Sequence, residues 1–164
     1  IKILEIGSLR GETTSFLSSV YPNAEIITCD MPTNANEYTN YGMNKNSFKK
    51  EFFKSKEKNL KKDNIQMIEI NSIFLIDKFA EKEFDLIWID GDHVNPQVTI
   101  DIIQCKILLK DNGMILCDDI IKQNVSFWGA NNDSYQTLEY LFHVCRRPFH
   151  FSNLLNWKKD LRDT

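Results

Sequence analysis

Short apolar runs alternate along the chain with longer segments whose apolar residues recur every three or four positions. The runs are four to six residues long and several are rich in isoleucine, which is typical of strands buried within a sheet. They predict strands at residues 1–6, 25–29, 66–70, 84–89 and 114–117, with a sixth near 149–154. The longer segments predict helices at residues 13–20, 47–62 and 96–109, and the last of these is expected to stop at Asn112-Gly113.

Helices between successive strands imply crossover connections, and crossovers join parallel strands. The predicted fold is therefore α/β: a doubly wound, Rossmann-like, mainly parallel sheet with helices on both faces. The length of 164 residues suits a single domain over residues 1–164. Because the chain starts at Ile1 without a methionine and enters a strand at once, we expect it to be truncated at the N-terminus.

Composition and charge narrow the classes of function. The chain is 42% hydrophobic and 26% charged with a net charge of -3, so a nucleic-acid partner is not expected, and neither is a membrane. The helix predicted at 47–62 carries seven lysines and two glutamates, which we interpret as a solvated face over an inner face of phenylalanines. The four cysteines are scattered without a CxxC pair, which indicates free thiols and a cytoplasmic protein. The oligomeric state is left open, with a homo-oligomer as one alternative.

A first candidate site follows the first two predicted strands. Gly7 permits a sharp turn after the first strand, and Gly11 lets the next helix begin close to it, where free backbone N–H groups can hold an anion. The second strand ends in Asp30, at the distance along the chain expected of an acid that binds ribose hydroxyls, although Asp30 could also be a turn former. Leu9 stands where dinucleotide enzymes have a second glycine, so an NAD-linked oxidoreductase is disfavoured.

These motifs together resemble a class I S-adenosylmethionine-dependent methyltransferase over roughly residues 1–121. The similarity is closest to the metal-dependent O-methyltransferases of the catechol and macrocin type. It implies that the loop from Gly7 to Thr13 holds the methionine part of the cofactor and that Asp30 binds its ribose. Asn71 and Ser72 would lie beside the adenine, unless they only cap a helix. The expected cofactor-binding residues are Glu5, Gly7, Ser8, Gly11, Thr13, Asp30, Asn71, Ser72 and Asp90.

A second candidate site follows the fourth and fifth predicted strands. Asp90 ends the fourth strand, and Asp118 and Asp119 end the fifth. Carboxylates that converge in one crevice repel each other unless a cation shares them, and hard oxygen ligands suit Mg²⁺, with Mn²⁺ or Ca²⁺ as alternatives. The resemblance implies a divalent metal that chelates the substrate oxygen to be methylated. The alternative is that these aspartates only cap a helix and form an Asx turn.

His93 lies three residues after Asp90, and an imidazole can take a proton from a hydroxyl near neutral pH. Its position matches the general base of the resembled enzymes. We therefore expect methyl transfer to a hydroxyl of a small molecule, with His93 as catalytic base. The alternatives are a metal-independent methyltransferase acting on a nitrogen or a nucleic acid, and a non-catalytic remnant that binds the cofactor. The candidates for residues that cover the bound substrate are Tyr38, Tyr41 and Phe127-Trp128-Gly129.

Overall fold

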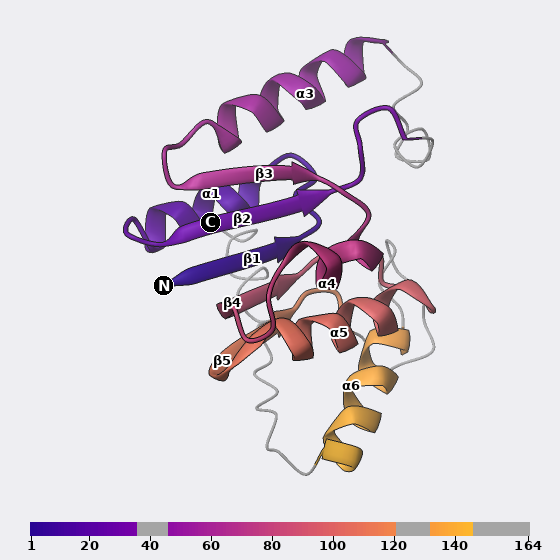
Figure 1. Cartoon of the computed structure of the whole chain (residues 1–164). Coiled ribbons are helices and arrows are strands. Elements are labelled where there is room, and N and C mark those ends of the chain that lie inside the picture. Colours follow the sequence, from indigo (N-terminus) through magenta and orange to yellow (C-terminus); the bar gives the residue numbers. More distant parts are fainter. Residues whose placement is uncertain (36–45, 121–131, 146–164) are drawn as a thin grey trace, which may run out of the picture.

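A five-stranded, wholly parallel sheet forms the centre of the molecule (Figure 1), as seen in a computed structural model that describes residues 1–35, 46–120 and 132–145. The strand order is β3-β2-β1-β4-β5, with each neighbouring pair parallel. The strands are β1 (Lys2–Ile6), β2 (Glu25–Asp30), β3 (Ile65–Glu69), β4 (Phe84–Ile89) and β5 (Leu109–Cys117). The order reverses after β3, so β1 and β4 flank the switch point at which such sheets bind ligands.

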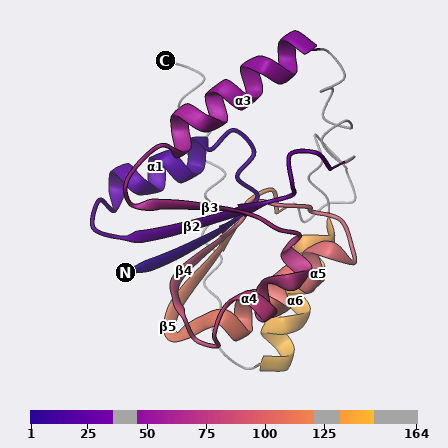
Figure 2. The same ribbon diagram turned by 45° about the horizontal axis from the view of Figure 1, so that its top comes forward.

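Helices cover both faces of the sheet (Figure 2). On one face lie α1 (Glu12–Val20) and α3 (Asn46–Leu60), which pack against each other. On the other lie α4 (Leu75–Lys78), α5 (Gln97–Leu108) and α6 (Asn132–Cys145), and a 3-10 turn, η1 (Ser72–Phe74), precedes α4. The predicted class, a doubly wound α/β fold with helices on both faces, is confirmed.

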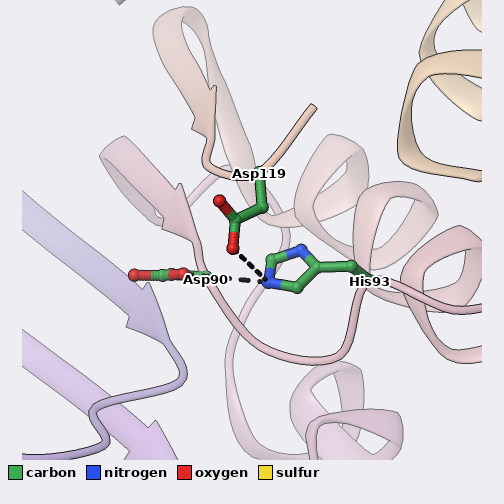
Figure 3. A group of neighbouring side chains, drawn as sticks. All are labelled: Asp90, His93 and Asp119. Carbon is green, nitrogen blue, oxygen red and sulfur yellow. Dashed lines mark ion pairs between the residues drawn. The ribbon is translucent and has the colours of Figure 1, made fainter. Parts of the chain in front are cut away.

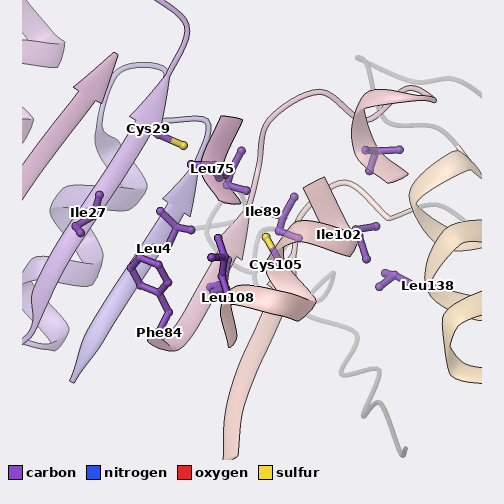
Figure 4. Close-up of a cluster of buried hydrophobic side chains, with 13 residues drawn as sticks. Leu4, Ile27, Cys29, Leu75, Phe84, Ile89, Ile102, Cys105, Leu108 and Leu138 are labelled. Atoms are coloured by element: carbon purple, nitrogen blue, oxygen red, sulfur yellow. The ribbon is translucent and has the colours of Figure 1, made fainter. Parts of the chain in front are cut away.

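The larger hydrophobic core lies between the sheet and α5 (Figure 4). Leu4 and Ile27 come from β1 and β2, while Ile102 and Leu108 come from the inner face of α5. Phe84 at the start of β4 is fully buried and meets Phe79 edge to face, with 5.1 Å between the ring centroids. Because the central strands are covered on both sides, they read as continuous apolar runs rather than as alternating patterns.

The helix predicted at 96–109 is present as α5, but the stop expected at Asn112-Gly113 was wrong. Helix α5 ends at Leu108, and Leu109 already pairs with Phe84 as the first residue of β5. The ladder then skips to a pair between Leu86 and Met114, so Asn112-Gly113 lies in a bulge within the strand. A Cβ at Gly113 would come within 2.7 Å of Leu109 and 2.9 Å of the Asp85 carbonyl oxygen, so glycine is needed for the bulge and not for a helix end.

The other predicted elements of the described part are present with small shifts at their ends. The strand predicted at 149–154 lies outside the described residues, as do Tyr38, Tyr41 and Phe127-Trp128-Gly129. Within the described ranges, none of the helices has the length and apolarity that a membrane crossing requires. Cys29, Cys105 and Cys117 are free, and burial raises the pKa of all three thiols.

Candidate cofactor and metal site

The ends of four neighbouring strands bring the predicted site residues to one edge of the sheet. Ile6 pairs with Cys29 on one side and with Ile89 on the other. Ile89 in turn pairs with Cys117. The residue that ends or follows each of these strands therefore stands beside its neighbours, and these residues are Gly7, Asp30, Asp90 and Asp118.

Gly7 makes the closest backbone approach in the site. Its φ of 91° lies in the left-handed region, and a Cβ at this position would stand 2.1 Å from the carbonyl oxygen of Asp90. Its N–H donates to the Cys29 carbonyl oxygen at 2.8 Å. Only glycine can fill this position, because any side chain would push the β1 turn away from the end of β4.

The loop after Gly7 is held by Asp30. The Ser8 hydroxyl and the Leu9 N–H both donate to Oδ2 of Asp30 at 2.9 Å. Leu9 has a φ of 43°, which is uncommon for a residue with a side chain, and the hydrogen bond to Asp30 holds it there. Asp30 thus organises the loop after Gly7.

Helix α3 closes over the far end of this loop. Gly11, with a φ of 73°, is buried so tightly that a Cβ would lie 2.7 Å from Leu60. Asn59 donates to the Arg10 carbonyl oxygen at 2.9 Å, and the Arg10 guanidinium lies over the rings of Phe48 and Phe52. The phenylalanine face predicted for this helix therefore packs toward the glycine loop, with Phe52 only 2% exposed.

Glu5 lies beneath the loop rather than at its surface. Its carboxylate is fully buried and accepts hydrogen bonds from the hydroxyls of Thr14 and, at 2.5 Å, Thr28. Burial raises the pKa of Glu5 to about 7. Thr14 is thus the threonine of α1 that contacts Glu5, whereas the predicted Thr13 is only half-buried. Glu5 thus ties β1, β2 and α1 together.

The residues after β3 are held by a polar stripe on α5. The Asn71 side chain caps η1 by accepting from the Ile73 N–H at 3.0 Å. Gln97 donates to the Ser72 hydroxyl at 2.7 Å and to the carboxylate of Asp101 at 2.8 Å. Asp101 is fully buried, and burial raises its pKa to about 6. The helix cap that the sequence offered as an alternative role is therefore present at Asn71. Helix α5 fixes the position of Ser72 through Gln97.

Asp90, His93 and Asp119 form the charged part of the site (Figure 3). Nε2 of His93 lies 3.6 Å from Oδ2 of Asp119 and 3.9 Å from Oδ1 of Asp90. One ligand atom from each residue lies within 4.8 Å of the others, which suits a shared cation. Both carboxylates are half-buried, so water can complete the coordination of such an ion.

The structure brings Asp90 and Asp119, two of the three predicted metal ligands, together with His93. Asp118 is not part of this group. Its Oδ1 accepts the Asp119 N–H at 2.9 Å, and its own N–H donates to the Ile89 carbonyl oxygen of β4. Asp119 has a φ of 50°, and this turn at the strand end carries its carboxylate toward His93.

The family model of the methyltransferase domain matches residues 4–120, which is well over half of the chain. The chain belongs to the methyltransferase domain family. The matched residues extend from β1 to the residue after Asp119 and so contain every predicted site residue. No curated protein matches the sequence.

Solved methyltransferase structures share the fold of this methyltransferase domain. A Staphylococcus aureus protein assigned as a caffeoyl-CoA O-methyltransferase superposes with a TM-score of 0.63 at 18% identity, over 93% of this chain and 71% of its own. The SAH-bound Podospora anserina methyltransferase PaMTH1 gives 0.59 at 20% identity, over 90% and 63%. The precorrin-6y C5,15-methyltransferase of Geobacter metallireducens gives 0.58 at 16%, over 85% and 62%. The chain thus spans less than two thirds of the latter two proteins.

Two residues of this methyltransferase domain escaped the sequence analysis. Lys56 was counted with the solvated lysines of its helix, yet it is buried and pairs with Asp30. Asp101 lies on the buried face of α5, where Gln104 is the other polar residue among apolar ones. The spacing of Gln97, Asp101 and Gln104 at i, i+4 and i+7 places all three on one side of α5, and this was the signal available in the sequence.

Proposed function

We propose that this methyltransferase domain binds S-adenosylmethionine at the carboxyl edge of its sheet and transfers the methyl group to a hydroxyl of a small molecule. The observation that carries the proposal is the contact between the glycine loop and Asp30, which places a tight turn and an acid side by side at the switch point. When bound, the cofactor would supply a methyl group already activated on a sulfonium. The protein then has to align the acceptor and ready its oxygen.

Each part of the cofactor has residues suited to it. Gly7, Ser8 and Gly11 would border the methionine part, and Glu5 beneath them keeps the loop in place. Asp30 would accept from the ribose hydroxyls. Ser72, fixed by its hydrogen bond from Gln97, would lie at the adenine side. The free Nδ2 of an amide cap such as Asn71 can serve the same side, so its capping role does not conflict with binding.

A divalent cation fits the chemistry of the cluster at the β4 and β5 ends. Asp90 and Asp119 would hold it through carboxylate oxygens, and a cation there would lower the pKa of a hydroxyl coordinated to it. His93 would take the proton from that hydroxyl, because its Nε2 already faces both carboxylates. With His93 as base, the two carboxylates suit Mg²⁺. A direct bond from His93 to the ion would instead favour Mn²⁺ or another metal that accepts imidazole, and His93 would then not be the base.

Several finer points belong to the same proposal. The acceptor is a small hydroxylated molecule rather than a nucleic acid, since the net charge of -3 gives no electrostatic attraction for phosphates. The described cysteines are free, which supports a cytoplasmic setting. The competing functions are a metal-independent methyltransferase and a non-catalytic protein that only binds the cofactor.

Transfer of a radiolabelled methyl group from S-adenosylmethionine to a panel of catechols and hydroxylated sugars tests the proposal. Labelled product that disappears with EDTA and returns with Mg²⁺ or Mn²⁺ is the expected result. Labelled product that EDTA does not diminish would favour the metal-independent alternative. Cofactor binding without labelled product from any acceptor, including amines and nucleic acids, would favour the non-catalytic one.

A further inference from the structure

Lys56 is a buried lysine on an otherwise solvated helix face. It is 5% exposed, whereas Lys49, Lys50, Lys54 and Lys58 of the same helix are exposed. Its ammonium lies 3.0 Å from Oδ2 of Asp30, and the two side chains are 7% and 15% exposed. A lysine is rarely buried in this way unless it is paired. The partner of this buried lysine is the acid that is expected to bind ribose.

The carboxylate of Asp30 already accepts four hydrogen bonds, three of them at Oδ2. Oδ2 accepts from the Ser8 hydroxyl, the Leu9 N–H and the Lys56 ammonium, and Oδ1 accepts from the Met31 N–H at 2.8 Å. An ionised carboxylate offers about four acceptor positions. Three of the four donors crowd Oδ2, which has only two lone pairs, whereas Oδ1 accepts one hydrogen bond. A ribose that uses both oxygens of Asp30 can therefore reach Oδ2 only by displacing one of the three donors there.

The four donors differ in how readily they can leave. The N–H groups of Leu9 and Met31 belong to the backbone of the loop and of the β2 end, and they cannot withdraw without moving the chain. The Ser8 hydroxyl also belongs to the loop that borders the ligand. Lys56 reaches across from α3 on a flexible four-carbon stem, so its ammonium can leave while the loop keeps its shape.

We propose that Lys56 sets the affinity of the site by competing with the ribose hydroxyls for Asp30. This inference rests on the proposed function, and it adds a residue of α3 to the cofactor site. In the ligand-free protein Lys56 offsets the charge of Asp30. On binding, a ribose hydroxyl replaces the Lys56 ammonium at the Asp30 carboxylate. Breaking the ion pair costs free energy, and this cost weakens the binding of the nucleoside.

Competition gives Lys56 a signature that a purely structural ion pair lacks. Replacing Lys56 with methionine removes the ion pair and lowers the melting temperature of the ligand-free protein, because a buried charge loses its partner. The same change removes the third donor from Oδ2 and the charge that offsets Asp30, so S-adenosylhomocysteine should bind roughly tenfold more tightly. Stability and affinity thus change in opposite directions. Loss of a structural contact would instead weaken both, or leave affinity unchanged.

Calorimetric titration of S-adenosylhomocysteine into wild type, Lys56→Met and Lys58→Met tests the inference, with melting temperatures of the free proteins recorded alongside. Lys58→Met is the matched control, since it removes an exposed lysine from the same helix. Tighter binding by Lys56→Met alone, with a lower melting temperature, is expected. Lys56→Leu, which likewise carries no donor, replaces it should the methionine variant fail to fold. Wild-type binding with unchanged or weaker binding by the Lys56 variants would overturn the inference and leave the proposed function intact. No binding to folded wild type would overturn both.

Discussion

His93 and Asp119 come from different strand ends and face each other across the site, with 3.6 Å between Nε2 of the imidazole and Oδ2 of the carboxylate. Asp119 belongs to the turn after β5, and His93 to the segment after β4. Because β4 and β5 are adjacent and parallel, the sheet itself brings these two groups together. The proposed metal and base chemistry therefore depends on the alignment of two strands rather than on one local motif.

The two adjacent aspartates after β5 should differ in their effect on metal binding. Asp119→Asn removes a carboxylate from the cluster and should weaken Mn²⁺ binding by tenfold or more, measured by calorimetry or by electron paramagnetic resonance. Asp118→Asn is the matched control, because the Asp118 carboxylate accepts the Asp119 N–H and lies outside the cluster. An equal loss of Mn²⁺ affinity in the two variants would contradict this account, because it would mean that both aspartates contribute to the metal site.

His93→Ala separates a base from a metal ligand. If His93 is the base, the variant should lose roughly 10²–10⁴-fold in methylation rate while its affinity for Mn²⁺ stays close to that of wild type. Part of the rate should return as pH rises, because an acceptor that is already ionised needs no base. A variant that instead loses Mn²⁺ affinity would assign His93 to the metal. A variant with wild-type rate and affinity would remove it from the mechanism.

Gly7 should tolerate no side chain. Gly7→Ala would place a Cβ 2.1 Å from the Asp90 carbonyl oxygen in a left-handed backbone conformation, and it should lower the free energy of unfolding by more than about 3 kcal/mol in urea titrations. Gly91→Ala is the comparison, because its nearest contact would be 3.2 Å from the Ile6 side chain. We expect a loss of about 1 kcal/mol or less there. Similar losses in both would show that the β1 turn is not as tight as described.

Glu5 should make the protein less stable as pH rises. The unfolded chain ionises Glu5 near pH 4.5, whereas the folded protein keeps the proton to about pH 7. Between these values the folded state binds more protons, so stability falls with rising pH, and the full penalty of up to about 3 kcal/mol is present above pH 7. Glu5→Gln stays neutral. Its free energy of unfolding, relative to wild type, should therefore rise from pH 4.5 to 7, and a difference that is flat across this range would contradict the burial of an ionisable Glu5.

The sequence predicted the sheet well because strands buried on both faces are continuous apolar runs. It also placed Gly7, Asp30 and Asp90 at one edge, since parallel strands end at the same side. It missed the bulge at Gly113 because Asn-Gly is equally typical of a helix end. It could not show that Asp119 rather than Asp118 lies in the group with His93, since this depends on the backbone angles of the turn after β5. Lys56 was missed because helical periodicity cannot show which lysine reaches an acid on another element.

The central claim is that S-adenosylmethionine binds over the glycine loop and Asp30, and a titration with the demethylated product S-adenosylhomocysteine tests it most directly. Wild type should bind, and at a concentration a hundred times the dissociation constant its stability should rise by about 2.7 kcal/mol. Asp30→Ala, shown to be folded, should lose most of this binding, and NADH should give no rise with either protein. Failure of folded wild type to bind, or equal binding by Asp30→Ala, would contradict the account.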